Sequence, residues 1–265
     1  MSTHNGHPIL VTGGTGTLGH RFVPLLQEAG GTVRVLSRSP REARNGIEYV
    51  SGDLDTGAGV EAAVEGVETI VHLAGAAKGD GEKARSLVGA AAGAGARHLV
   101  YISVVGADRV PVASGVDRAM FGYFESKLAA ERIVADSGVP YTTLRATQFH
   151  DLLLTTVRGM AKLPVIPVPS GFQVQPVDSG EVAARLVELT LGAPAGLVPD
   201  IAGPRTYRMA DAVRGYLKAR HKHRALVPLR LPGQGARAFR AGANLAPDRA
   251  IGRRTWEEFL AAEVG

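Results

Sequence analysis

The sequence contains no cysteine, no long apolar run and no recognisable secretory leader. Without cysteine the chain has no disulfide framework, no catalytic thiol and no thiolate metal ligand, so any redox chemistry needs a bound cofactor. No apolar stretch approaches the roughly 18 residues that a membrane span requires. The first residues, MSTHNGHP, carry neither the basic nor the apolar segment of a signal peptide. We therefore predict a cytoplasmic protein with no membrane partner.

Acidic side chains are scarce in one region, residues 205–254. This region holds thirteen Lys or Arg and two carboxylates, Asp211 and Asp248, whereas the rest of the chain is net acidic. Such a block is typical either of a phosphate or nucleic-acid surface or of a solvated face. Because apolar residues such as Val213 and Leu217 interleave with the cations at helical spacing, we favour the solvated face. Nucleic acid is not an expected partner, and the oligomeric state is left open.

The first part of the 265-residue chain alternates short runs rich in Val and Ile with helical patterns. The runs are ILVT, VRVLS, IEYV, TIVHLA, HLVYIS and YTTLR, at residues 9–12, 33–37, 47–50, 69–74, 98–103 and 141–145. The segments between them place apolar residues three and four apart, as at Leu87, Val88 and Ala91. This alternation predicts an α/β protein with a doubly wound parallel sheet that is buried on both faces.

The alternation ends near residue 150, where a proline-rich passage, LPVIPVPSGFQVQPVD, begins at Leu163. Proline cannot donate to a central ladder, so its short strand-like pieces belong at sheet edges or in loops. We predict one domain over residues 1–150, to which a later segment around 178–202 returns, and a smaller region over 151–265.

Two capping boxes indicate where later helices begin. Asp178 and Glu181 precede VAARLVELTL, and Thr255 and Glu258 precede the final helix. In each pair the first side chain satisfies a free amide of the first turn, and the acidic residue reaches back to the cap. These signals are structural.

A glycine-rich loop joins the first predicted strand to the first predicted helix. It reads TGGTGTLG, residues 12–19. Gly13 permits a tight turn, Gly16 lets the backbone approach a pyrophosphate, and Gly19 lets the helix pack closely. The amides at the helix N-terminus then favour an anion. We therefore predict a dinucleotide site formed by Gly13, Thr15, Gly16, Thr17, Leu18 and Gly19.

The end of the second strand bears on which dinucleotide binds. An NAD site places a carboxylate there for the ribose hydroxyls, whereas an NADP site places a cation for the 2′-phosphate. This sequence has Ser37, Arg38 and Ser39 at that point, so we predict NADP(H), with Arg38 as the phosphate ligand. Asp53, followed by Leu54, is placed to face the adenine, with a turn-forming role for Asp53 as an equal alternative.

Several motifs in a fixed order resemble those of the atypical short-chain dehydrogenase/reductases, and of their NmrA-like branch in particular. The motifs are TGGTGTLG, VRVLSR, GDL, HLAG (72–75), VYISVVGAD (100–108), YFESK (123–127) and LRATQFHDLL (144–153). The resemblance implies a Rossmann domain with a smaller C-terminal substrate-capping region. It also implies NADP(H) lying across the carboxyl edge of the sheet.

Tyr123 and Lys127 match the family's Tyr-x-x-x-Lys motif. Four residues apart on a helix, the two side chains share one face. The ammonium can then lower the pKa of the phenol and hold the nicotinamide ribose, while the phenol gives a proton to a carbonyl oxygen. The alternative is that Tyr123 packs beside Phe121 and Phe124 and that Lys127 pairs with Glu131 on the helix surface.

A hydroxyl of the family's catalytic set is displaced in this sequence. Complete members carry Ser or Thr after the strand that corresponds to residues 98–103, a position that falls near Val104 or Val105 here. Ser103 lies one or two residues early, and a shift of one residue reverses the direction of a strand side chain. The Ser-Tyr-Lys set is therefore incomplete or rearranged, with Ser103, Tyr123 and Lys127 as the catalytic candidates.

The resemblance also implies further cofactor contacts, which depend on backbone and shape more than on side-chain type. They are Leu73, Ala74, Gly75, Lys127, Thr147, Gln148 and Phe149. We expect His72 and His150 to be structural, and we expect no metal site because His221 and His223 lack carboxylates at ligand spacing.

Two functional hypotheses follow. The first is an NADPH-dependent oxidoreductase that transfers hydride to a small organic acceptor, either a quinone or an aromatic or polyketide-type ketone. The second is a non-catalytic NADP(H)-binding redox sensor of the NmrA-like type. The substrate class in the first hypothesis depends on analogy at the level of the fold.

Overall fold

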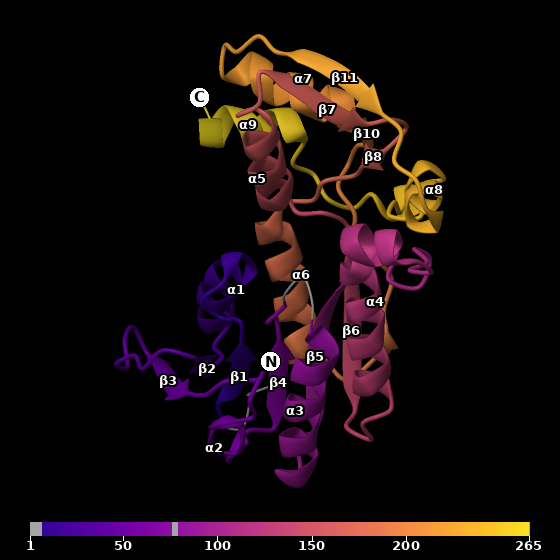
Figure 1. The fold of residues 1–265 in the computed structure, drawn as a ribbon. Coiled ribbons are helices and arrows are strands. Elements are labelled where there is room, and N and C mark those ends of the chain that lie inside the picture. Colours follow the sequence, from indigo (N-terminus) through magenta and orange to yellow (C-terminus); the bar gives the residue numbers. More distant parts are fainter. Residues whose placement is uncertain (1–6, 76–78, 265) are drawn as a thin grey trace. The chain divides into compact units, whose positions relative to one another are not determined.

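The structure, a computed structural model, describes residues 7–75 and 79–264. Residues 1–6, in which we predicted no signal peptide, lie outside the described residues. The chain divides into two compact units (Figure 1): the first comprises residues 1–103, 126–144 and 182–198, and the second comprises 104–125, 145–181 and 199–265. The division into a cofactor-binding domain over residues 1–150 and a substrate-capping region over 151–265 stays a prediction. No helix within the described residues is long and apolar enough to cross a membrane.

A seven-stranded parallel sheet forms the centre of the Rossmann fold. Its strands, in spatial order, are β3 (Ile47–Ser51), β2 (Val33–Ser37), β1 (Ile9–Thr12), β4 (Thr69–His72), β5 (His98–Val104), β6 (Tyr141–Ala146) and β9 (Gly196–Leu197). Val11 of β1 is in register with Val35 of β2 and with Val71 of β4, so the chain winds outward in both directions from β1. The predicted doubly wound α/β class is confirmed. The carboxyl ends of β1 and β4 meet at the topological switch point, where such sheets bind ligands.

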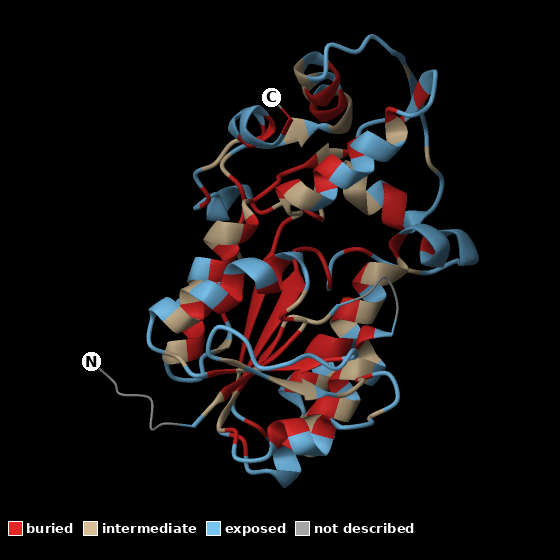
Figure 2. Ribbon diagram, turned by 90° about the vertical axis from the view of Figure 1, so that its left-hand side faces the viewer, coloured by how far each residue is buried: buried red, intermediate tan, exposed pale blue. Residues whose placement is uncertain are grey.

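Helices cover both faces of this sheet. They are α1 (Thr17–Glu28), α2 (Val60–Val64), α3 (Asp80–Gly93), α4 (Gly115–Ala135) and α6 (Ser179–Leu191). Figure 2 shows the buried strands in red, with helices on either side whose exposed residues face outward. On one face, Leu10, Ile70 and Leu99 of the strands pack with Leu87 of α3 and Val134 of α4. Burial of both faces explains why the strands have continuous apolar runs rather than alternation.

The second unit is built from short strands and helices around its own core. Its elements include α5 (His150–Met160), β7 (Val165–Pro169), β8 (Gln173–Val174), β10 (Tyr207–Arg208), α7 (Met209–Ala219), β11 (Ala225–Leu229), α8 (Gln234–Arg240) and α9 (Trp256–Val264). β7 pairs with β11 in parallel and β8 with β10 in antiparallel fashion, as two separate two-stranded sheets. The proline-rich passage therefore lies in edge strands, as predicted from its prolines.

The two predicted capping boxes differ in detail. Thr255 and Glu258 form a reciprocal box, because Thr255 N–H donates to Glu258 Oε2 at 2.7 Å and Glu258 N–H donates to Thr255 Oγ1 at 3.3 Å. Asp178 caps α6 by accepting from Gly180 N–H at 2.8 Å. Glu181, however, accepts from Arg253 N–H at 2.9 Å instead of reaching back to the cap. The expected second half of that box is therefore replaced by a contact that fixes the segment before α9.

Candidate functional site

The glycine loop between β1 and α1 leaves no space for side chains at two of its glycines. Gly13 has a φ of 72°, and a Cβ added there would lie 2.5 Å from the backbone nitrogen of Ala74. A Cβ at Gly19 would collide with the carbonyl oxygen of Gly13. Gly16 N–H donates to that same carbonyl at 3.0 Å, which closes the turn. The loop is therefore held between the segment after β4 and the first turn of α1.

Among the residues that the structure describes, no side chain caps the N-terminus of α1. Gly16 is the N-cap residue, no acidic residue lies in the first turn, and Thr17 is exposed while Thr15 is half-buried. The amides of the first helical residues have no intrahelical acceptor and lie at the positive end of the helix dipole. Leu18 is buried and anchors this turn. The residues present thus fit a pyrophosphate held by backbone amides, the interaction that a dinucleotide needs at this point.

The end of β2 presents a cation and no carboxylate. Arg38 is exposed, and within the part of the chain that the structure describes it has no carboxylate at salt-bridge distance. Ser37 Oγ donates to Ser39 O at 2.8 Å, which shapes the turn that carries Arg38. Arg34, the other cation of this strand, pairs with Glu48 at 2.8 Å. Arg38 is thus an exposed cation at this position, and its contact with a 2′-phosphate stays a prediction.

Asp53 adopts the turn-forming arrangement that the sequence left as an alternative. Its carboxylate accepts from Asp55 N–H at 2.9 Å, and its own N–H donates to Ala58 O at 2.8 Å. Leu54 is buried in the core beside the sheet. A contact of either residue with adenine stays a prediction.

The segment after β4 leaves the sheet two residues earlier than predicted, at His72 rather than at Ala74. Leu73 N–H still donates to Thr12 O at 3.0 Å, and Thr12 Oγ1 lies 2.7 Å from His72 Nδ1. Ala74 then passes against Gly13, and Gly75 follows as an exposed residue. The backbone of Leu73 and Ala74 therefore lies beside the end of β1 and the glycine loop, and the cofactor contacts that the resemblance implied for residues 73–75 stay a prediction.

Lys127 of α4 is buried inside the first unit, with 3% of its surface exposed. Its Nζ lies 3.1 Å from Asp80 Oδ2, donates to Ile102 O at 3.3 Å and lies 5.1 Å from the centre of the Tyr101 ring. A Cβ added at Gly75 would be 3.0 Å from the same Nζ. Burial lowers the pKa of Lys127, and the Asp80 carboxylate opposes that shift.

Asp80 is a site residue that the sequence reasoning missed. It is fully buried at the start of α3, and its N–H donates to Ser126 Oγ of α4 at 3.0 Å. A signal was present, because a lysine on a buried helical face needs a carboxylate partner. The predicted alternative placed Lys127 on the helix surface, paired with Glu131. That placement is wrong, because Lys127 is buried.

Ser103 lies near the carboxyl end of β5 with 5% of its surface exposed. Its Oγ has no hydrogen-bond partner among the residues that the structure describes. A buried hydroxyl without a partner is costly, so a bound ligand or an ordered water is expected at this position. This geometry keeps Ser103 as a candidate despite its shifted place in the sequence.

Tyr123 lies on α4 four residues before Lys127, and it belongs to the second unit whereas Lys127 belongs to the first. Its half-buried ring packs edge-on against Phe124, with 5.7 Å between centroids. Phe124 in turn contacts Phe239 at 5.4 Å. The packing of Tyr123 beside Phe124 is therefore observed, whereas its packing beside Phe121 and its role as a proton donor stay predictions.

The side chains after β6 are engaged within the second unit. Gln148 donates to Asn244 O at 3.3 Å and accepts from Gln175 N–H at 3.2 Å. Thr147 Oγ1 accepts from Gly203 N–H at 3.4 Å. Phe149 is the N-cap residue of α5. Any contact of these residues with a cofactor stays a prediction and would use backbone groups, as the resemblance implied.

Two buried histidines have lowered pKa values. Burial, with the positive charges of Lys127 and Lys83, lowers the pKa of His72 from 6.5 to about 3. His150 stacks against both Trp256 and Phe259, which also contact each other, and burial lowers the pKa of His150 to about 4. Both rings are therefore neutral near pH 7, in keeping with the structural roles predicted for them.

Acid is expected to destabilise the protein through these two histidines. Their folded pKa values lie below the unfolded value of 6.5, so the unfolded state binds more protons below that pH. The stability they contribute is present above about pH 6.5 and is lost as the pH falls towards the folded pKa values, about 4 for His150 and about 3 for His72. Urea unfolding at several pH values measures this loss. His150→Phe, which keeps the stacking, should show a smaller loss than the wild type. Replacing the exposed His20 with Gln is the control, and an unchanged slope in His150→Phe would contradict the assignment.

The residues that the structure describes contain no group of three or more His, Asp or Glu side chains arranged to hold a metal ion.

A parallel sheet wound outward from β1, with a glycine cradle at the switch point, defines the class of dinucleotide-binding Rossmann proteins. The chain matches the NAD(P)H-binding family over residues 13–189 and belongs to it. The dinucleotide-binding family that the resemblance implied is thereby confirmed, and so is an NAD(P)H cofactor.

Relatives of known activity include reductases. The chain is 31% identical over 189 residues to (4-alkanoyl-5-oxo-2,5-dihydrofuran-3-yl)methyl phosphate reductase of Streptomyces griseus, covering 69% of this chain and 63% of that protein. It is 28% identical over 144 residues to quinone oxidoreductase 2 of Escherichia coli, covering 52% and 47%. The chain therefore spans less than two thirds of the length of either curated relative.

A solved structure shares the fold over nearly the whole chain. It is an NADPH-dependent quinone oxidoreductase from Escherichia coli complexed with NADPH. The TM-score is 0.80 with 20% identity, over 96% of this chain and 99% of that one. At this identity the likeness establishes the fold.

Proposed function

We propose that the protein is an NADPH-dependent reductase that delivers hydride to a small organic acceptor, a quinone or an aromatic ketone. The observation that carries the proposal is the glycine cradle at the uncapped N-terminus of α1, with Arg38 in place of an acidic residue at the end of β2. The reductase activities of the two curated relatives support the reaction class.

Under this proposal, different groups of the chain would bind the cofactor, bind the acceptor and supply the proton. Backbone amides at the start of α1 hold the pyrophosphate, and Arg38 pairs with the 2′-phosphate. Ser103 Oγ, which is buried and has no partner among the described residues, is available to donate to a carbonyl oxygen. A proton reaches the reduced acceptor from Tyr123 or from a water held by Ser103 or Lys127. The cofactor, when bound, supplies the hydride.

The second candidate is an NADP(H)-responsive binding protein without turnover. One observation favours it: Lys127 Nζ is engaged with Asp80 and with Ile102 O, so it already has partners other than the nicotinamide ribose. Under this hypothesis the buried ion pair is structural, and the cofactor site serves as a sensor.

A titration with NADPH and NADH, followed by a panel of quinones and aromatic ketones, separates the candidates. The wild type should bind NADPH at least about tenfold more tightly than NADH, because a charge-assisted bond to the 2′-phosphate forms only with NADPH. Arg38→Asp should remove that preference, whereas Arg132→Asp, at an exposed position of α4, should keep it. Fluorescence of the reduced nicotinamide reports the binding.

Acceptor-dependent loss of nicotinamide absorbance would support the reductase, and Ser103→Ala should slow that loss without weakening NADPH binding. Tight NADPH binding with no turnover across the panel would support the sensor instead. A preference for NADH in the wild type would contradict the role given to Arg38.

A further inference from the structure

One face of the two-stranded sheet formed by β7 and β11 is apolar and exposed. Alternate residues of β7, Ile166 and Val168, are buried in the core of the second unit. The residues on the opposite face, which should be polar in a sheet covered on one side, are apolar in both strands. They are Val165, Pro167, Pro169, Ala225, Val227 and Leu229, paired in register as Val165 with Ala225, Pro167 with Val227 and Pro169 with Leu229.

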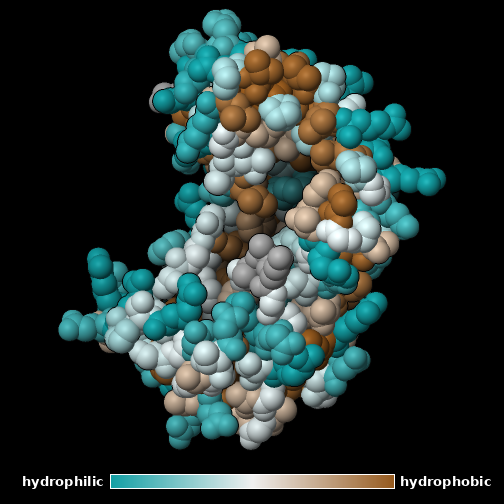
Figure 3. All heavy atoms as spheres, in the orientation of Figure 1, coloured by the Kyte–Doolittle hydropathy of each residue, from teal (hydrophilic) through white to brown (hydrophobic). Residues whose placement is uncertain are grey.

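This apolar face is open to solvent. Val165 is 48% exposed, Val227 is 50% exposed and Leu229 is 48% exposed. The neighbouring Leu163 is 44% exposed. Figure 3 shows apolar side chains gathered over β7 and β11 beside hydrophilic ones. Contiguous exposed apolar surface of this kind marks a contact with a partner or with a membrane.

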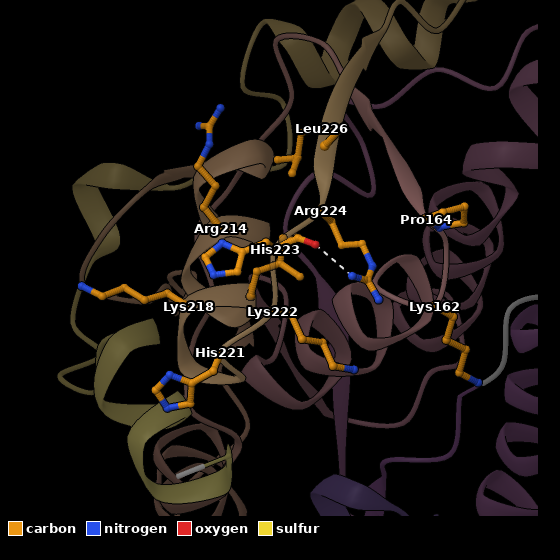
Figure 4. A pocket seen from close by; sticks show the side chains of 11 residues that line it. Lys162, Pro164, Arg214, Lys218, His221, Lys222, His223, Arg224 and Leu226 are labelled. Atoms are coloured by element: carbon orange, nitrogen blue, oxygen red, sulfur yellow. Dashed lines mark hydrogen bonds between the residues drawn. The ribbon is translucent and has the colours of Figure 1, made fainter.

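A cationic cavity adjoins the face where both strands begin. Its volume is about 1070 Å³. Seven of its eleven lining residues are Lys, Arg or His: Lys162, Arg214, Lys218, His221, Lys222, His223 and Arg224 (Figure 4). Ala225 lines the cavity and also begins the apolar face, so the two features are continuous. No lining residue is acidic.

The cations of this cavity are largely unneutralised. Arg214 pairs with Asp211 at 2.7 Å. Lys162, Lys222 and Arg224 have no carboxylate within salt-bridge distance among the residues that the structure describes. The C-terminus of α7 accounts for cations in its last turn, but Lys222 and Arg224 lie beyond that turn. The cavity therefore offers positive charge in excess of what the fold requires.

We propose that the β7–β11 face and the adjoining cavity dock this protein on an anionic phospholipid surface. Lipid phosphates would enter the cationic cavity, and the aliphatic side chains of the face would enter the interfacial layer, the combination by which peripheral proteins hold a membrane. Such a contact needs no spanning helix, so it departs from our sequence-based prediction of no membrane partner, which considered only spanning segments and a signal peptide. The inference is independent of the proposed reductase activity.

The charge and chemistry of the surface argue against other occupants. Two copies of the chain packed through this face would bring no acidic lining residue to either cationic cavity, so the positive charge would stay unneutralised. Nucleic acid is recognised through aromatic stacking and polar contacts, whereas this face is aliphatic and proline-rich. A lipid surface satisfies both the apolar face and the cations.

Co-sedimentation of the full chain with vesicles tests the proposal. The protein should sediment with vesicles of phosphatidylcholine and phosphatidylglycerol, but not with phosphatidylcholine alone, and salt should weaken binding. Lys222→Glu combined with Arg224→Glu should lower the partition coefficient by more than about tenfold. Val227→Ser combined with Leu229→Ser should lower it by several-fold.

Matched controls are available elsewhere in the chain. Arg132→Glu removes an exposed cation from α4, and Ile251→Ser removes an exposed aliphatic side chain, 62% exposed, from another surface of the second unit. Both should sediment like the wild type. Thermal unfolding and NADPH titration of every variant establish that the fold and the cofactor site are intact.

Four results would overturn the proposal. The first is a failure of the wild type to sediment with anionic vesicles, and the second is wild-type binding by the charge-reversed variant. The third is full binding by the serine variant together with competition by duplex DNA as strong as that by lipid, which would define a general polyanion surface. The fourth is self-association in sedimentation velocity that the serine substitutions abolish, which would assign the face to a second copy of the chain.

Discussion

Gly13→Ala is expected to weaken NADPH binding by roughly a hundredfold, the equivalent of losing two charge-assisted hydrogen bonds to phosphate. The added Cβ would lie 2.5 Å from Ala74 N, and the residue would be strained at its φ of 72°. The loop must then shift away from the segment after β4, and the amides at the start of α1 lose their alignment with the pyrophosphate. Fluorescence titration with NADPH measures the effect.

Gly30→Ala is the control that distinguishes the strain of a positive φ from the collision of a new Cβ with neighbouring backbone. Gly30 also has a positive φ, 88°, but no atom lies within 4 Å of a Cβ added there. Gly30→Ala should lower the free energy of unfolding by about 1 kcal/mol, the cost of placing a residue with a Cβ in the left-handed conformation. It should bind NADPH like the wild type. Equal binding by Gly13→Ala and Gly30→Ala would show that the cradle does not hold the cofactor.

Asp80→Asn is expected to lower the free energy of unfolding by about 3–5 kcal/mol, because it leaves the buried Lys127 ammonium without its carboxylate. The substitution keeps the shape of the side chain, so the loss reports charge rather than packing. Urea unfolding measures it. The cost should shrink at higher pH, where the amine, whose pKa burial already lowers, gives up its proton.

The double variant Asp80→Asn with Lys127→Met tests the same pair in the other direction. With both charges replaced, most of the lost stability should return, since the buried ammonium that had lost the Asp80 carboxylate is no longer present. Glu82→Gln, which breaks the exposed Glu82–Arg85 pair at 2.6 Å, is the matched control and should change stability little. If Asp80→Asn matched that control, the buried pair would not hold α3 to α4.

The fold could be predicted from the sequence because its determinants are local. Strands such as β1 and β2 are continuous apolar runs between turn signals, and their observed bounds, Ile9–Thr12 and Val33–Ser37, equal the predicted ones. The glycine loop is equally local, because its geometry depends on which residues lack a side chain. β9 was missed, since two residues, Gly196 and Leu197, carry no periodicity.

The site was only partly predictable because its remaining contacts join distant segments. Asp80 and Lys127 meet between two helices, and nothing near either residue specifies the partner. The pairing of β7 with β11 is likewise set by tertiary packing, so the exposed apolar face does not follow from the proline-rich passage alone. Ser103 was placed correctly on its strand, but its lack of a partner emerges only from its three-dimensional surroundings.

The first unit is assembled from three separate stretches of chain, the last of them Val182–Val198. A ribosome therefore releases the glycine loop early but delivers β9 and most of α6 only after more than half of the chain has been made. Folding of the first unit can be completed only when residue 198 has emerged, by which time much of the second unit is also outside. The first unit can thus be completed before the second, whose last stretch, residues 199–265, is still to be made, and a nascent chain that ends near residue 150 lacks part of the sheet that positions the dinucleotide.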